Sequence, residues 1–197
     1  MSAASDITVA TSAFVVAVVA VFGVWTWRRE LIGKTKFELA RKTMLLGSKL
    51  ISDFESARNP FTWAGESVGR TKEDNESASR TQTLDQWYAR AHRLQPLVED
   101  LRQFEELHWE AEAILSAPAA KCVSEALAVY RKQFAELSSA ISSYFDTVAR
   151  GCPLSDEDQK WLRELSKDMY SRGDDDFSQL IREATTNLAQ ALKPYVR

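Results

Sequence analysis

Residues 118–150 read PAAKCVSEALAVYRKQFAELSSAISSYFDTVAR and carry the clearest periodic pattern in this chain of 197 residues. Their large apolar side chains recur at gaps of three and four residues, which places them on one face of an α-helix. These residues are Val123, Leu127, Tyr130, Phe134, Leu137, Ile141, Tyr144 and Val148. Pro118 suits the first turn of a helix and Gly151 its C-terminal end. The stretch therefore predicts a long amphipathic helix that buries one side.

The residues after this stretch predict another long helix, over residues 156–193. Ser155 is suited to the N-cap, and the acidic residues that follow it favour the positive end of the helix dipole. The helical spacing of apolar residues continues across Gly173, so we expect one bent helix. Three carboxylates at residues 174–176 could bind a hard cation, but they lack the alternating spacing of a calcium-binding loop. We therefore interpret them as a solvated acidic bend.

Two more helices are predicted earlier in the chain, over residues 28–58 and 83–116. Both segments carry apolar residues at helical spacing, so each should bury one face. Pro60 ends the first helix, because the residue before a proline avoids the helical conformation. Thr83 begins the second, with a glutamine three residues later as in a capping box. Pro96 should kink this second helix or split it in two.

These four segments define the predicted fold class. Helices of about 30–38 residues, connected mostly by short turns, favour an antiparallel, up-and-down four-helix bundle. No stretch shows the alternation that strands require, and glycine and proline are scarce, with 7 and 5 residues. We therefore expect an all-α helical domain over residues 28–197.

Residues 7–27, ITVATSAFVVAVVAVFGVWTW, form an apolar stretch without a charged residue. As a helix it would be roughly 31 Å long, which matches the ~30 Å hydrocarbon core of a bilayer. A cleaved signal peptide is the alternative, but residues 1–6 lack basic residues and the apolar stretch is longer than such peptides need. Its end has the residues typical of a membrane–water interface: Trp25, Trp27, Arg28 and Arg29. The stretch therefore predicts a single transmembrane helix.

Basic residues gather on one side of this predicted span and indicate its orientation. Six of them follow it closely: Arg28, Arg29, Lys34, Lys36, Arg41 and Lys42. Because cationic segments stay in the cytoplasm, we expect residues 1–6 outside and residues 28–197 in the cytoplasm, at the inner membrane. Small residues recur along one side of the span, at Ala10, Ala13, Ala17 and Ala20. Such a stripe lets helices approach closely in lipid, so it predicts a possible homo-oligomer formed through the span.

The segment at residues 59–82 is polar and irregular, and long loops of this kind are often functional. Phe61 and Trp63 are its large apolar residues. One interpretation is that they cap the end of the bundle core. The other is that they anchor a partner protein, and both interpretations remain open at this point.

Charge and motifs exclude several classes of function. The chain carries 25 Lys and Arg against 28 Asp and Glu, a net charge of −3, so we expect no nucleic-acid partner. Glu105 and His108 have the Glu-x-x-His spacing of di-iron bundles, but the second such pair is missing. Phosphate-binding loops and nucleophile motifs are also missing. We therefore assign no catalytic residue, no metal ligand and no cofactor.

Three functional hypotheses follow from these observations. The first is a non-enzymatic, membrane-tethered helical module that presents its cytoplasmic bundle to a protein partner. The second is a subunit of a membrane assembly, such as a membrane-perturbing effector or a transport accessory. The third is a metal-dependent enzyme that uses Glu105, His108 and the carboxylates at residues 174–176.

Overall fold

A computed structural model describes residues 3–61, 63, 65–72, 76–149, 155–170 and 175–196. Within these ranges, the side chains of residues 3–13, 15, 79, 149 and 168 are not described. The described chain is all-α and consists of five α-helices packed as a bundle, with a final 3₁₀ turn. They are α1 (Ala3–Ala57), α2 (Ala78–Ile114), α3 (Ala117–Ala149), α4 (Asp156–Met169), α5 (Asp176–Leu192) and η1 (Lys193–Tyr195). The predicted all-α bundle is therefore confirmed at this level.

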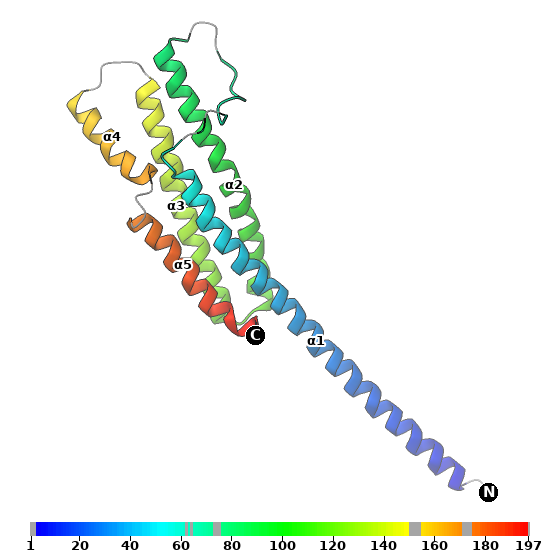
Figure 1. The fold of residues 1–197 in the computed structure, drawn as a ribbon. Coiled ribbons are helices and arrows are strands. Elements are labelled where there is room, and N and C mark those ends of the chain that lie inside the picture. Colours follow the sequence, from blue (N-terminus) through cyan, green and yellow to red (C-terminus); the bar gives the residue numbers. More distant parts are fainter. Residues whose placement is uncertain are drawn as a thin grey trace.

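Neighbouring helices in the bundle run antiparallel. Lys49 of α1 pairs with Asp100 of α2, whereas the more N-terminal Arg93 reaches the carbonyl of Ser56 near the end of α1. The α2 helix packs on α1 and α3, and α5 packs on α1 and α3 from the other side. Figure 1 shows that the α1–α2 connection lies at the end of the bundle opposite to the emerging N-terminal part of α1. We call this end the tip and the opposite end, where η1 lies against α1, the base.

The core forms where the apolar faces of α1, α2, α3 and α5 meet. Leu137 in the middle of α3 is fully buried, as the periodicity predicts. Tyr130 lies edge-on to Phe104, with ring centroids 5.2 Å apart, and its hydroxyl is hydrogen-bonded to Thr185 of α5 at 2.8 Å. At Gly47, a Cβ atom would lie 3.1 Å from a methyl group of Leu188, so α1 approaches α5 closely at this position.

The predicted single helix over residues 156–193 is wrong, because the chain forms two helices there. Tyr170 ends α4 with an extended backbone (φ −116°, ψ 127°), and Asp175 is extended again (φ −84°, ψ 159°) before α5 begins. The side chain of Asp175 accepts a hydrogen bond from the backbone N–H of Ser178 at 2.8 Å and so caps α5. Gly173, across which a continuous helix was expected, lies outside the described residues.

The start of α2 also differs from the prediction. Ser77 is the N-cap and accepts a hydrogen bond from the backbone N–H of Arg80, so Thr83 lies inside the helix rather than at its start. Pro96 lies within α2, and the helix continues through it without being divided. At α4 the prediction is confirmed, because Ser155 and Asp158 form a capping box.

The first half of α1 extends beyond the base of the bundle as a single helix (Figure 1). Its described apolar side chains from Phe14 to Trp27 are exposed. In the described part of the chain, none of the helices combines the length and the apolar character needed to cross a membrane. The predicted span at residues 7–27 falls partly outside that part, because the side chains of residues 7–13 and 15 are not described.

Candidate partner-binding site at the bundle tip

The connection between α1 and α2 begins with a local turn after the last residues of α1. The side chain of Asn59 accepts a hydrogen bond from the backbone N–H of Phe61 at 2.9 Å, an arrangement typical of asparagine in turns. Pro60 between them cannot extend the helix. The chain therefore leaves the axis of α1 at this point and crosses the tip of the bundle.

Arg93 of α2 fixes the first part of this connection. Its guanidinium group donates to the carbonyl oxygens of Asn59 at 2.9 Å and Phe61 at 2.5 Å. It also binds both carboxylate oxygens of Glu66, at 2.8 and 2.9 Å. Together with the carbonyl of Ser56, one largely buried arginine thus binds three backbone carbonyls and one carboxylate, and it contacts described residues before and after Trp63.

Arg70 fixes the second part of the connection. It forms a two-fold ion pair with Glu76 at 2.7 Å and a further hydrogen bond to Asp85 of α2 at 2.6 Å. Next to it, a Cβ atom at Gly69 would lie 2.6 Å from the hydroxyl of Tyr88, so the loop approaches α2 closely and a larger residue would require the Tyr88 side chain to move. The described part of the connection is therefore attached to α2 at two positions.

The apolar side chains of this connection point away from the bundle. Phe61 is 74% exposed, Trp63 is 75% exposed and Val68 is 81% exposed. Phe61 and Trp63 therefore do not form part of the core, and the interpretation that they cap it is wrong. Two large aromatic side chains in water next to a well-attached backbone form the most conspicuous exposed apolar feature at the tip.

An open groove lies beside Trp63, between the connection and the first turns of α2. It has a volume of about 530 Å³. Its lining residues are mostly small or uncharged: Trp63, Ser67, Ala78, Thr81, Gln82, Asp85, Gln86 and Ala89. The groove therefore offers hydroxyl and amide groups next to an aromatic surface, a combination suited to a peptide or a protein loop.

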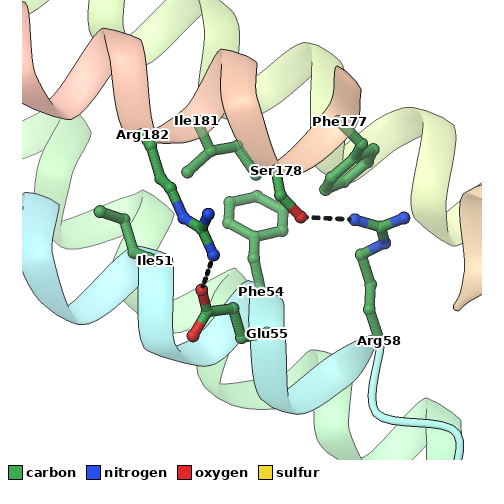
Figure 2. A pocket seen from close by; sticks show the side chains of 8 residues that line it. All are labelled: Ile51, Phe54, Glu55, Arg58, Phe177, Ser178, Ile181 and Arg182. Atoms are coloured by element: carbon green, nitrogen blue, oxygen red, sulfur yellow. Dashed lines mark hydrogen bonds and ion pairs between the residues drawn. The ribbon is translucent and has the colours of Figure 1, made fainter. Parts of the chain in front are cut away.

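Below the tip, Arg58 connects the end of α1 to the junction between α4 and α5. Its side chain is 1% exposed and binds both carboxylate oxygens of Asp175, at 2.9 and 3.0 Å. It also donates to the hydroxyl of Ser178 and to the carbonyls of Lys167 and Tyr170, at 3.0–3.2 Å. Figure 2 shows Arg58 beside the ring of Phe177, whose centroid is 4.1 Å from the guanidinium carbon.

The cavity drawn in Figure 2 is too small for a ligand, since about 10 Å³ holds at most one water molecule. This part of the structure is therefore a structural junction. It also corrects the interpretation of a solvated bend at Asp175, which caps α5 and pairs with a buried arginine, whereas Asp176 is exposed. Asp174 lies outside the described residues.

A second buried arginine, Arg90, lies close to this junction. Its guanidinium carbon is 4.6 Å from the ring centroid of Tyr170, and it donates one hydrogen bond to the carbonyl of Pro60 at 3.3 Å. Burial lowers the pKa of Arg90, because the charged form loses its hydration. The sequence gives no signal for the roles of Arg58 and Arg90, since buried arginines look the same as surface arginines of a helix.

The described residues that were considered for a metal site do not form one. Glu105 pairs with Arg131 of α3 at 2.5 Å, on the surface between the two helices. His108 is buried against the ring of Trp109, with centroids 5.0 Å apart, and its Nε2 lies 3.5 Å from Glu112. Among the described residues, no group of three or more His, Cys, Asp or Glu is arranged to hold a metal ion.

The residues predicted for the membrane interface lie on the projecting part of α1. Trp25 and Trp27 are exposed, and the guanidinium carbon of Arg29 lies 5.9 Å from the ring centroid of Trp25. Of the predicted small-residue stripe, Ala17 and Ala20 are exposed. The side chains of Ala10 and Ala13 lie outside the described residues.

Comparison of the chain with models of protein families, with curated proteins and with solved structures finds no match. No relative therefore supplies a function for the tip, and its chemistry follows from its own residues.

Proposed function

We propose that this chain is a non-enzymatic, membrane-tethered interaction module whose bundle tip binds a cytoplasmic protein. One observation carries this proposal: Phe61 and Trp63 are about three-quarters exposed although the backbone beside them is attached to α2. Exposed aromatic residues of this kind commonly supply the largest single contributions to protein–protein binding. The groove beside Trp63 adds a site for polar groups of the same partner.

The attachment of the connection by Arg93 and Arg70 supports a binding role rather than a simple linker. A loop that is already ordered loses less conformational entropy when it binds, so more of the contact energy appears as affinity. The two arginines together make ion pairs with Glu66, Glu76 and Asp85. A linker that only connected α1 to α2 would not require this number of buried contacts.

The membrane tether in this proposal rests on the sequence of residues 7–27, which contains no charge. The continuity of α1 and the exposure of its apolar residues before the bundle support it, since a bilayer would cover these side chains. From residue 27 to the end of α1 a helix would rise roughly 45 Å, so the tip would stand well clear of the lipid. The basic residues after the span favour a cytoplasmic bundle. Periplasmic activity of a reporter fused after Arg197 would contradict this orientation.

The docking role is tested with Phe61→Ala combined with Trp63→Ala in the tagged full-length chain, extracted in a mild detergent. We expect the double variant to lose the protein that co-purifies with the wild type, since each aromatic anchor commonly contributes about 2 kcal/mol or more. Its thermal unfolding, followed by circular dichroism, should match that of the wild type, because neither side chain lies in the core.

Trp109→Ala is the matched control, because Trp109 is also exposed but lies on α2 away from the tip. This variant should retain the co-purifying protein. Unchanged co-purification by the double variant would contradict a docking role for the tip.

The second candidate function is a subunit of a membrane assembly, and one observation favours it. A groove of about 660 Å³ between α1 and α2 contains the exposed Leu45 together with Leu46 and Leu107. Its rim carries both basic and acidic residues, including Lys42 and Glu110. Burial of this groove against a second subunit would give a complex larger than one chain, which sedimentation in detergent would detect.

A further inference from the structure

Two acidic side chains lie beside Lys49 in the contact between α1 and α2. Asp100 of α2 is buried, with 1% of its side chain exposed, and its Oδ1 accepts a hydrogen bond from Nζ of Lys49 at 2.6 Å. Asp53 lies four residues after Lys49 on α1, and therefore on the same face of this helix as the lysine that pairs with Asp100. The Oδ2 atoms of both aspartates are buried and receive no hydrogen bond from a donor group.

Two buried carboxylate oxygens without a donor are unfavourable if both groups are ionised, because each charge loses hydration and repels the other. A single proton shared by the two carboxyl groups removes one negative charge and, with it, the repulsion. A protonated carboxyl group is a donor, so Asp53 can donate to Asp100 while Lys49 neutralises the remaining charge. The geometry thus provides a place for one proton and one cation next to two carboxyl groups.

We propose that Asp53 and Asp100 form a proton-sharing pair that holds α1 against α2 when protonated and weakens this contact when the proton leaves. Burial, the hydrogen bond to Asp100 and the repulsion between the two groups raise the pKa of Asp53 to about 6, and Lys49 opposes this shift only in part. The proton is therefore lost within the range of pH found in cells and their compartments.

Two charged groups next to the pair, Glu99 and Lys49, do not titrate in the same range. Hydrogen bonds from Arg102 and Gln103 lower the pKa of Glu99, on the neighbouring surface of α2, to about 2. The hydrogen bond to Asp100 raises the pKa of Lys49, so its ammonium group stays charged. On the α5 side of α1, Arg182 is paired with Glu55 at 2.9 Å.

The direction of the pH effect follows from the raised pKa. The folded chain binds a proton at Asp53 more tightly than the unfolded chain, whose aspartates titrate near 4. This stabilising contribution is complete below about pH 4 and is lost as the pH rises through about 6. The α1–α2 contact should therefore be more stable at pH 5 than at pH 8.

The test is thermal unfolding of the full-length chain in detergent at pH 5 and pH 8, comparing the wild type with Asp53→Asn. Asparagine has the shape of a protonated aspartate and can donate to Asp100 at any pH. The variant should have a higher midpoint than the wild type at pH 8, and this difference should be about half as large at pH 5. Both proteins contain the same histidines, so the difference between them reports on Asp53 alone.

Asp146→Asn is the matched control, because Asp146 is exposed on α3. It should follow the wild type at both pH values. A wild type and an Asp53→Asn variant that differ equally at pH 5 and pH 8 would overturn the proposal.

Carbon-13 NMR of the side-chain carboxyl of Asp53 in the wild-type chain gives a measurement that needs no variant. An inflection near pH 6 is expected. An inflection near pH 4, the ordinary value for an aspartate, would show that no proton is held and would also overturn the proposal.

Discussion

At the scale of single residues, Arg58 shows most clearly how this sequence connects the end of α1 to the junction between α4 and α5. A buried guanidinium group is unfavourable unless its donors are satisfied, and Arg58 has a carboxylate, a hydroxyl and two backbone carbonyls around it. The same contacts lie at the end of α4 and at the start of α5. The carbonyl of Tyr170 and the carboxylate of Asp175 turn toward one arginine instead of continuing a helix.

The first prediction concerns this junction. Arg58→Ala should lower the free energy of unfolding by about 3–5 kcal/mol, because it leaves the carboxylate of Asp175 and two carbonyls without their partner. Arg182→Ala removes an exposed ion pair of the same length, at 2.9 Å, and should cost under about 1 kcal/mol. Urea denaturation of both variants measures the difference. Equal losses would contradict the assignment of Arg58 as the main connection at the junction.

At the scale of elements, apolar periodicity predicted the helices well and their ends less well. The spacing of apolar residues located α1, α2 and α3, and the serine and acidic residues located the start of α4. The break before α5 was missed because the apolar spacing stays in phase across it. The contacts at this break come from Arg58, which lies more than one hundred residues earlier in the sequence. The capping signal at Thr83 was misleading, because Ser77 caps a longer helix.

The second prediction concerns the packing of α3. Leu137→Ala should lower the free energy of unfolding by about 2–5 kcal/mol, since it leaves a cavity in a fully buried part of the core. Leu45→Ala, on the exposed side of α1, is the control and should change stability by less than about 1 kcal/mol. Chemical denaturation of the two variants under the same conditions tests this directly. A small loss at Leu137 would mean that α3 does not face the interior.

At the scale of the whole molecule, the two halves of α1 differ in how their side chains are packed. Its first half carries exposed apolar side chains, and its second half forms one wall of the bundle (Figure 1). The sequence predicted a bundle helix for the second half, whereas the membrane span predicted for the first half stays a prediction. The tip is different, since the sequence indicated Phe61 and Trp63 but left their exposure open. The direction of these two side chains depends on Arg93 and Arg70. Arg93 binds the connection from α2, and Arg70 attaches the connection to Asp85 of α2.

The measurement that tests the central claim most directly is photo-crosslinking from the tip in intact cells. A photoreactive phenylalanine derivative replaces Trp63 in one version of the full-length chain and Trp109 in another, both exposed positions. If the tip binds a protein, irradiation should give a discrete adduct from position 63 and none of the same mass from position 109. Absence of an adduct at position 63, or the same adduct from both positions, would contradict a partner-binding tip.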